Sequence, residues 1–167
     1  MMTRRLFVTS TSLAALAALT WRADMAMTAE KTFELTHSDD EWRRLLSKEQ
    51  YDVLRKHGTE RAGTSALNRE KRVGTFVCAA CEQPLFSAKT KYESGTGWPS
   101  FYEPLPNAIG TSTDRSWFTT RTEVHCSRCG GHLGHVFDDG PKPTGLRYCM
   151  NGVAMKFVPA AEPGASS

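Results

Sequence analysis

The sequence of 167 residues has no large excess of charge of either sign, because its Lys, Arg, Asp and Glu residues are interspersed and leave a net charge of +3. A charge this small supports neither an extended nucleic-acid surface nor a patch for anionic membranes. The sequence also lacks an unbroken apolar run of the about 20 residues that a membrane-spanning helix needs. The apolar stretch Leu6–Thr20 is interrupted by Ser and Thr. We therefore expect no nucleic-acid partner and no stable membrane span.

The chain has only five cysteines, which is an odd number. An odd number argues against a secreted disulfide framework in which every sulfur has a partner. Four cysteines form two Cys-x-x-Cys pairs, Cys78 with Cys81 and Cys126 with Cys129. This is the ligand number and local spacing of a structural zinc site, although the gap between the pairs is longer than in common zinc ribbons. Two reactive dithiols or two disulfides are the alternatives.

Cys149 is the cysteine without a partner. A closed four-cysteine zinc site leaves no coordination position for chemistry, so Cys149 is the candidate nucleophile. Arg147 and Asn151 lie two positions to either side, and on a strand all three side chains would share a face. The cation favours the thiolate, and the amide can donate a hydrogen bond to a polar substrate. The alternative is a small cysteine buried in a β core beside a solvated arginine.

Two further motifs carry side chains that suit chemistry on a polar, methylated substrate. His132 and His135 in GGHLGHVF offer imidazoles that can protonate a leaving oxygen near neutral pH. They can also be spare metal ligands or structural hydrogen-bonding groups. The turn-rich run SGTGWPSF presents Trp98 and Phe101. Aromatic walls bind methyl and thioether groups well, although both residues are also common in cores.

Composition and local signals predict one packed domain that begins with two short helices. Hydrophobic residues make up 40% of the chain and aromatic residues 10%, which excludes wholesale disorder. Ser38 precedes Glu41 by three residues and Ser47 precedes Gln50 by three, and each pair predicts a capping box. The second helix should end near Gly58 in a left-handed conformation. The residues expected to face inward are Trp42, Leu45 and Leu46, and then Tyr51, Val53 and Leu54.

The rest of the chain is predicted to be mainly β, with short antiparallel strands. Gly, Pro, Asn and Ser separate short runs rich in β-branched and aromatic residues after residue 58. Both Cys-x-x-Cys pairs should lie at strand ends or turns, where two distant parts of the chain can be joined by a metal. The expected strands are Phe76–Cys78, Trp117–Val124, His132–Phe137, Arg147–Met150 and Ala154–Phe157.

The N-terminus has the profile of an export signal over residues 1–29. Met1–Arg5 is basic, an apolar stretch follows, and acidic residues are absent before Asp24. Thr3–Val8 resembles the twin-arginine signal of bacteria, which exports proteins that have already folded. A metal-loaded domain suits that route, so we expect a periplasmic or otherwise exported protein. The alternative is a merely basic apolar N-terminus, since no clean Ala-x-Ala cleavage site follows.

Taken in order, the runs VCAAC, SGTGWPSF and CSRCGGHLGHVFDDGPKPTGLRYCMN resemble the methionine-R-sulfoxide reductase family, MsrB, over residues 36–160. The resemblance implies two antiparallel sheets with short N-terminal helices, one structural zinc ion held by the two Cys-x-x-Cys pairs, and a nucleophilic Cys149. It also implies that Trp98 packs on the substrate's methyl group, that His132 and His135 position and protonate the sulfoxide oxygen, that Arg147 and Asn151 support the thiolate and the substrate, and that Asp139 orients its neighbours.

The chain departs from the family pattern in two places. Thr96 stands where many relatives carry a resolving cysteine. The resemblance then implies that a sulfenic acid on Cys149 is reduced directly by an external thiol, such as a thioredoxin-like protein or a small thiol. The second departure is Gly152, where relatives commonly have Ser, which puts a minor polar contact in doubt.

The sequence therefore predicts an enzyme that reduces the R epimer of methionine sulfoxide in peptides and proteins and acts as a monomer. The expected organisation is an export signal over 1–29, an MsrB domain over 36–160 and a flexible tail over 161–167. Two rival hypotheses are a zinc-clipped binding module and a disulfide oxidoreductase that uses one Cys-x-x-Cys pair as a dithiol. The low net charge and the thiol flanked by Arg147 and Asn151 argue against the binding module.

Overall fold

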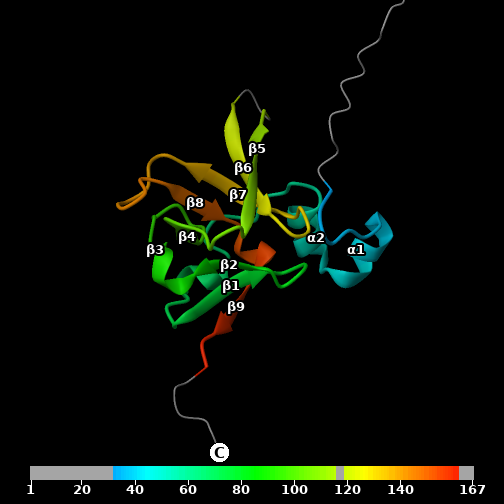
Figure 1. Ribbon diagram of the computed structural model, residues 1–167, viewed down its shortest axis with the longest axis horizontal. Helices are drawn as coiled ribbons and strands as arrows, with labels where there is room; N and C mark the ends of the chain where they lie inside the picture. The colour runs from blue at the N-terminus through cyan, green and yellow to red at the C-terminus, as the bar shows by residue number, and fades with distance from the viewer. Residues whose placement is uncertain (1–31, 116–118, 162–167) are drawn as a thin grey trace, which may run out of the picture. The chain divides into compact units, whose positions relative to one another are not determined.

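The computed structural model (Figure 1) describes residues 32–115 and 119–161, and the account below is confined to them. The expected export signal, residues 162–167 of the expected tail and part of the expected strand Trp117–Val124 lie outside the described residues. Among the residues described, no helix is both long and apolar enough to cross a membrane.

Both predicted capping boxes are confirmed. Helix α1 spans Asp39–Leu45 and helix α2 spans Lys48–Leu54. The Ser38 hydroxyl accepts from the Glu41 backbone N–H at 3.3 Å, and the Glu41 carboxylate accepts from the Ser38 backbone N–H at 2.8 Å. Ser47 and Gln50 repeat this exchange before α2. Each helix therefore begins where its first free backbone N–H groups find a side-chain acceptor.

Two details of the helices differ from the prediction. Leu45 is 61% exposed, because a helix of seven residues has only one narrow buried face, here centred on Trp42. The left-handed residue after α2 is His57, with φ of 56°, and not Gly58. Gly58 is required for close approach: its N–H donates to the Asp52 carbonyl at 2.9 Å, and a Cβ atom would lie 2.8 Å from that oxygen.

The strands form two antiparallel sheets, as the sequence predicts. The smaller sheet has the order β2-β1-β9, with β1 over Gly74–Cys78, β2 over Pro84–Ser87 and β9 over Met155–Pro159. The larger sheet has the order β3-β4-β8-β7-β6-β5, with β3 over Lys91–Tyr92, β4 over Ser100–Phe101, β5 over Ile109–Asp114, β6 over Arg121–Cys126, β7 over His132–Phe137 and β8 over Arg147–Met150. Three short 3-10 turns, η1 over Ala66–Arg69, η2 over Ala88–Thr90 and η3 over Gly152–Ala154, connect them.

The strand predictions are confirmed where the hydrophobic pattern is strong. Strands β7 and β8 have the predicted bounds, and β1 and β9 overlap their predicted ranges. Strands β2 to β5 were not predicted. Two of them have only two residues each, β2 opens with a proline, and β5 has three exposed polar residues in its centre. Such strands lack the alternation of apolar and polar residues on which a sequence-based prediction rests.

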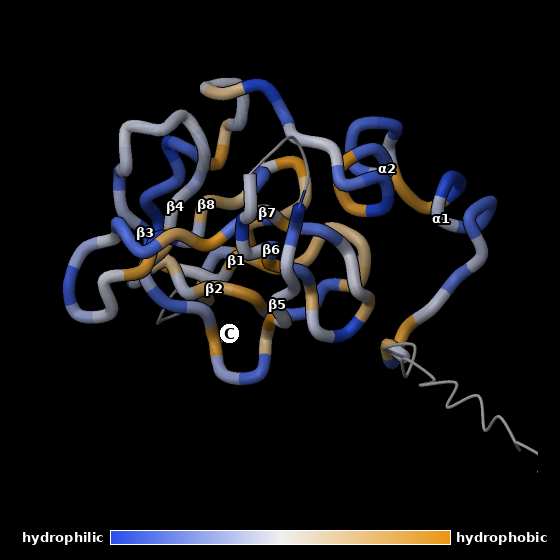
Figure 2. Tube along the Cα trace, turned by 90° about the horizontal axis from the view of Figure 1, so that it is seen from above, coloured by the Kyte–Doolittle hydropathy of each residue, from blue (hydrophilic) through white to orange (hydrophobic). Residues whose placement is uncertain are grey.

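An aromatic cluster forms the centre of the core. Phe86 of β2 stacks on Phe101 of β4 with ring centroids 4.4 Å apart, and Phe76 of β1 meets Phe101 edge-on at 4.9 Å. All three side chains are fully buried. Figure 2 shows the hydrophobic stretches along β1 and β2 that supply part of this core. The cluster joins the smaller sheet to β4, the strand next to the one that carries Cys149.

Candidate functional site

Cys149 lies in the middle of the larger sheet, on β8, opposite Ser100 of β4 and His135 of β7. Its side chain is half-buried and faces a hollow of about 110 Å³, which we call the thiol pocket. The pocket is lined by Thr59, Trp98, Arg121, Gly134, His135, Phe137, Cys149 and Asn151. A thiol at such a pocket is reachable by a small group of a substrate, unlike a cysteine sealed in a core.

The glycine between the two histidines explains how His135 comes to lie beside the thiol. A Cβ atom on Gly134 would collide with the carbonyl oxygen of Cys149. Glycine therefore lets β7 approach β8 closely at this point, and the next residue along β7 pairs directly with Cys149. The glycine directly before His135 is therefore required for steric reasons.

One irregular segment before η1 holds two walls of the thiol pocket in place. The Trp98 indole N–H donates to the Glu60 carbonyl at 3.1 Å. The Glu60 backbone N–H donates to the Asn151 side-chain oxygen at 3.0 Å, and the Asn151 amide donates to the Leu133 carbonyl at 3.0 Å. Main-chain groups therefore fix the Trp98 indole and the Asn151 amide before any substrate binds. The hydrogen bonds of Asn151 are to the backbone, so this side chain chiefly supports the pocket.

The Glu60 side chain is a structural element of the site that the sequence analysis missed. Its two carboxylate oxygens accept from the backbone N–H groups of Gly152 at 2.5 Å and Val153 at 3.0 Å. These are the first N–H groups of η3, which would otherwise lack an acceptor. Nothing in the local pattern marks Glu60, because its partners lie about ninety positions later in the chain.

We expect Glu60→Ala to destabilise the protein and to weaken the reaction at Cys149. Loss of the carboxylate leaves two backbone N–H groups without their acceptor, at a cost of about 1–3 kcal/mol in the free energy of unfolding. Urea denaturation measures this cost, and steady-state rates measure the effect on activity, which we expect to fall about tenfold. The control is Glu34→Ala, which removes an exposed ion pair with Arg128. Equal stability of the two variants would contradict the role given to Glu60.

Thr96 lies against the nucleophile. Its hydroxyl oxygen is 3.6 Å from the Cys149 sulfur and 2.8 Å from the Ser94 hydroxyl, which in turn lies 2.7 Å from the Ser100 hydroxyl. A chain of three hydroxyls therefore ends at the thiol and can donate a hydrogen bond to a thiolate. A cysteine at position 96 would stand within reach of Cys149.

The structure separates the two histidines. His135 lines the thiol pocket, and its Nε2 atom lies 2.7 Å from a carboxylate oxygen of Asp114, which also binds Arg121 at 2.7 Å. Burial lowers the pKa of His135, and the hydrogen bond to Asp114 opposes this change only in part. His132 lies behind His135, with ring centroids 5.3 Å apart, and is 2% exposed. The lowered pKa of His135 favours its neutral form.

Arg147 is bound by a carboxylate and is not among the residues that line the thiol pocket. Its guanidinium donates two hydrogen bonds to Asp139, both of 2.8 Å, and lies 4.3 Å from the centroid of the Phe137 ring. The hydrogen bond to Asp139 is the main reason that the pKa of Arg147 is raised. Phe137 lines the thiol pocket, and the guanidinium stacks on its ring. Asp139 orients this guanidinium through its two hydrogen bonds.

The four-cysteine cluster, Cys78, Cys81, Cys126 and Cys129, forms at a second place in the fold. The sulfurs of Cys78 and Cys129 are 3.8 Å apart, those of Cys81 and Cys126 are 3.5 Å apart, and all four lie within 4.8 Å of one another. A disulfide has an S–S distance of about 2.05 Å, so the cysteines are thiols.

These distances fit a metal ion. Four thiolates around zinc at about 2.3 Å form a tetrahedron with edges of about 3.8 Å. All four cysteines are buried, and each pair bridges a strand end and the following turn, at β1 and at β6. The convergence that the sequence left open is therefore confirmed. Four buried cysteines that lie close together can hold a metal ion at the junction of the two sheets.

Residues 46–159 match the family model described as the SelR domain. Proteins named peptide methionine sulfoxide reductase MsrB are similar over most of their own length. The one from Leptospira interrogans serogroup Icterohaemorrhagiae serovar Lai is 55% identical over 126 residues, which cover 75% of this chain and 96% of the relative. That from Methanosarcina barkeri is 53% identical over 130 residues, covering 77% and 90%, and that from Agrobacterium fabrum is 50% identical over 127 residues, covering 75% and 94%. The chain belongs to the MsrB family.

Some residues that the sequence suggested for the site lie outside the thiol pocket. Trp98, His135, Cys149 and Asn151 line it, whereas Phe101, His132 and Arg147 do not. Phe101 is fully buried and stacked on Phe86, so it belongs to the core and has no surface for a substrate. Neighbouring residues on a strand face opposite sides, and the sequence did not reveal which side of β4 faces the core.

The second departure from the MsrB pattern, Gly152, has a steric explanation. A Cβ atom on Gly152 would collide with the Ser65 hydroxyl oxygen. Ser65 lies just before η1 and its hydroxyl accepts from the Leu67 backbone N–H at 3.1 Å. A hydroxyl from another part of this MsrB chain therefore occupies the space beside residue 152.

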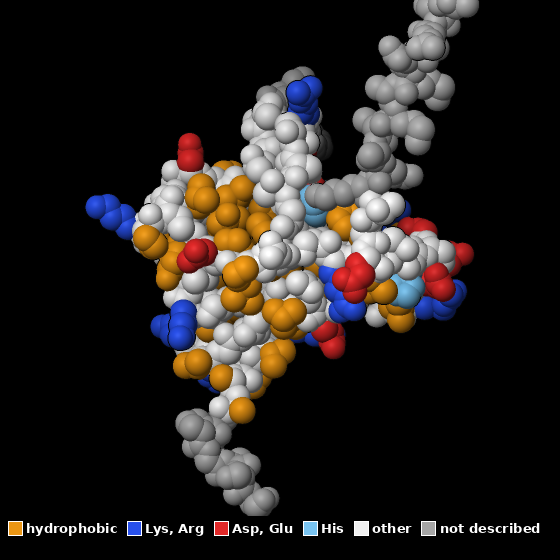
Figure 3. All heavy atoms as spheres, viewed as in Figure 1, with side chains coloured by type: hydrophobic (Ala, Val, Ile, Leu, Met, Phe, Trp, Pro, Cys, Tyr) orange, Lys and Arg blue, Asp and Glu red, His pale blue; other side chains and the backbone are white. Residues whose placement is uncertain are grey.

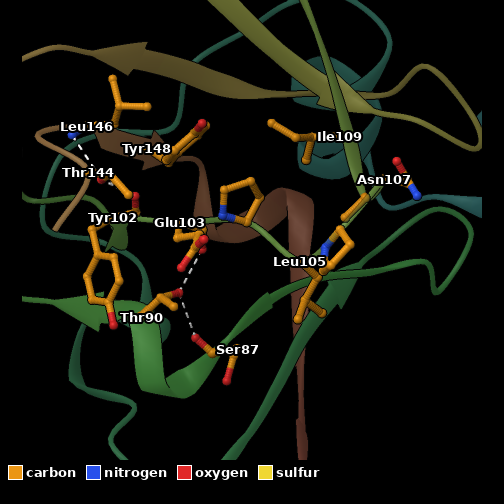
Figure 4. A pocket seen from close by; sticks show the side chains of 13 residues that line it. Ser87, Thr90, Tyr102, Glu103, Leu105, Asn107, Ile109, Thr144, Leu146 and Tyr148 are labelled. Atoms are coloured by element: carbon orange, nitrogen blue, oxygen red, sulfur yellow. Dashed lines mark hydrogen bonds between the residues drawn. The ribbon is translucent and has the colours of Figure 1, made fainter.

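A second hollow, larger than the thiol pocket, does not contain the thiol. It measures about 650 Å³, and Figure 4 shows the side chains that line it. Tyr148 and Leu146 of the β8 region enter it together with Leu105 and Ile109. Hydrophobic side chains also gather over the region of β8 in the space-filling view (Figure 3). No cysteine or histidine lines this hollow.

Proposed function

We propose that this protein reduces the R epimer of methionine sulfoxide in peptides and proteins to methionine, with Cys149 as the nucleophile. The observation that carries the proposal is the half-buried Cys149 thiol in a pocket walled by Trp98 and His135, in a chain of the MsrB family. The indole offers an apolar face for a methyl group, while the imidazole and the amide of Asn151 lie on the polar side of the pocket.

In the proposed reaction the Cys149 thiol and the sulfoxide become a sulfenic acid and a thioether. The S–O bond of the sulfoxide breaks and an S–O bond forms at Cys149, so the thiol is oxidised by two electrons and the sulfoxide is reduced by two. The thiolate attacks well only when the sulfoxide oxygen receives a proton, so a thiolate and an acid must act together. The hydroxyl of Thr96, 3.6 Å from the sulfur, supports the thiolate.

The proposal includes an external reductant. The chain has five cysteines, and the four besides Cys149 form the buried cluster at the sheet junction. Two equivalents of an outside thiol, from a thioredoxin-like protein or a small thiol, therefore reduce the sulfenic acid and release a disulfide and water. In this proposal the cluster holds one zinc ion, which stabilises the fold and takes no part in the reaction.

The proposal also includes export through the twin-arginine route and action as a monomer. Its support is Arg4 and Arg5 ahead of an apolar stretch, which precede a domain whose metal cluster needs a folded scaffold. A periplasmic enzyme of this kind would repair oxidised methionine in proteins outside the cytoplasm.

The decisive experiment offers both epimers of a methionine sulfoxide peptide with dithiothreitol. We expect the R epimer to be consumed and the S epimer to remain, because the indole, the imidazole and the thiol fix three different directions around the sulfur. Chromatography of the peptide after chiral derivatisation measures both. Consumption of the S epimer alone, or of neither epimer, would refute the proposal.

A cysteine at position 96 should add an internal disulfide step. The Thr96 hydroxyl lies 3.6 Å from the Cys149 sulfur, so we expect Thr96→Cys to form a disulfide with Cys149 after one turnover without reductant. Mass spectrometry of the oxidised protein measures it. Thr96→Ser is the matched control and should form no disulfide. A persistent sulfenic acid in Thr96→Cys would contradict the proposed proximity.

A further inference from the structure

A second cluster of titratable groups surrounds one buried carboxylate, Glu123 of β6, which is 7% exposed. One of its oxygens lies 2.8 Å from the Nδ1 atom of His132 and 3.1 Å from the Nδ1 atom of His57. The other oxygen lies 3.5 Å from the Nδ1 atom of His125 and accepts from the Ser112 hydroxyl at 2.5 Å. The sequence analysis did not single out Glu123, His57 or His125.

Glu123 is an anion at neutral pH. Burial alone would raise its pKa, but hydrogen bonds from three imidazoles and one hydroxyl outweigh burial and hold the pKa well below its usual range. The same contact raises the pKa of His57. The buried anion therefore favours the protonated form of the His57 imidazole.

The geometry also decides which nitrogen of His132 is available for chemistry. Because Nδ1 faces the Glu123 carboxylate, it carries a proton and donates it. The Nε2 atom is buried, and no group of the described chain forms a hydrogen bond with it. A buried ring nitrogen without a partner is unusual and calls for an explanation.

His132 lies one residue layer behind the thiol pocket. Its ring meets that of His135 at 5.3 Å between centroids, and His135 pairs with Cys149 across β7 and β8. Cys149 thus lies on the far side of His135 from the Glu123 carboxylate. The titratable and charged groups around His132 are Glu123, His125, His57 and His135, with Asp114, Arg121 and Arg55 farther out.

We propose that Glu123 is a positioning residue which fixes the tautomer and orientation of His132, and through the packed ring of His132 the orientation of His135 in the wall of the thiol pocket. The inference rests on the proposed function. A carboxylate behind an imidazole acts in this way in catalytic triads, where it orients the ring and stabilises the imidazolium without taking the proton itself.

The same groups could also be read as a metal site, because two histidines and a carboxylate form a common donor set. The ring nitrogen opposite a metal-bound one normally donates to a carboxylate, a carbonyl or water. His132 has no such partner for Nε2 among the described residues. The positioning role therefore fits the geometry better, and metal binding becomes an outcome that the experiment must exclude.

The test measures a single turnover without reductant, as methionine formed per chain, across pH 5–9. Glu123→Gln removes the carboxylate charge to which His132 donates and leaves the two stacked rings less firmly oriented, so we expect the single-turnover rate to fall about tenfold across this range. Glu41→Gln, which keeps the capping box of α1, is the matched control and should show the wild-type profile.

A second measurement needs no variant of Glu123. Nitrogen-15 NMR of the histidine rings in the wild-type protein should show the His132 ring protonated at Nδ1, and Glu123→Gln should lose that signature. A wild-type profile in Glu123→Gln, or a wild-type His132 protonated at Nε2 alone, overturns the proposal while leaving the reductase activity intact. So does a second bound zinc ion that His57→Asn removes. Asparagine tolerates the left-handed backbone at position 57, where φ is 56°.

Discussion

Cys149→Ser should lower the rate of methionine sulfoxide reduction by at least about a thousandfold. A serine hydroxyl ionises far less readily than a thiol and cannot form a sulfenic acid, so both the attack and the product are lost. Serine occupies nearly the same volume in the half-buried site beside Thr96, and the protein should remain folded. Rates with dithiothreitol measure the loss.

The control for this substitution is the metal content and the melting temperature of the same variant. Both should equal the wild-type values, because Cys149 lies outside the four-cysteine cluster. Activity within a few fold of wild type would remove Cys149 from the reaction. If the variant loses both its activity and its fold, alkylation of Cys149 in the wild-type protein replaces it as the test. Alkylation should abolish turnover without unfolding the protein.

Removal of the metal should unfold the domain. Zinc in a structural four-cysteine site contributes about 10–16 kcal/mol of apparent binding free energy, whereas a domain of this size has a net stability of about 5–15 kcal/mol. A metal ion held by the four cysteines would join β1 and β6, which belong to different sheets. We therefore expect chelator, or Cys126→Ser, to abolish the cooperative thermal transition seen by circular dichroism.

Cys149→Ser is the matched control for this experiment, since it removes one thiol elsewhere and should keep one zinc ion per chain. Metal analysis after dialysis against chelator measures the content directly. A chain that loses its metal and keeps its melting temperature would contradict the structural role. The metal-depleted wild-type protein and Cys149→Ser should differ clearly in melting temperature, because all four cysteines of the cluster are buried.

The sequence predicted features whose causes are local. Each capping box needs only a serine and an acceptor three residues later, and both were found. Strands β7 and β8 were placed correctly because their apolar residues are frequent and their ends are marked by glycine and proline. The convergence of the Cys-x-x-Cys pairs was a hypothesis, since it depends on how β1 and β6 are brought together.

The features that the sequence could not predict depend on contacts between distant residues. Glu60 acts on η3, and Glu123 collects donors from β5, β7 and the segment after α2, so no local window reveals either. Phe101 was placed in the site because it is aromatic and close to Trp98, yet it faces the core. Residue type indicates what a side chain can do, while the sheet decides which side of a strand it faces.

The thiol pocket has a consequence for how the protein is made. Its walls come from Thr59, Trp98 and Asn151, and the Glu60 carboxylate that steadies them binds backbone groups up to Val153. Strand β1 of the smaller sheet pairs on one side with β9, which is the last strand described. The ribosome must therefore release the chain through Val153 before the pocket can be completed. Truncated or nascent chains would carry an unshielded Cys149 thiol but no activity.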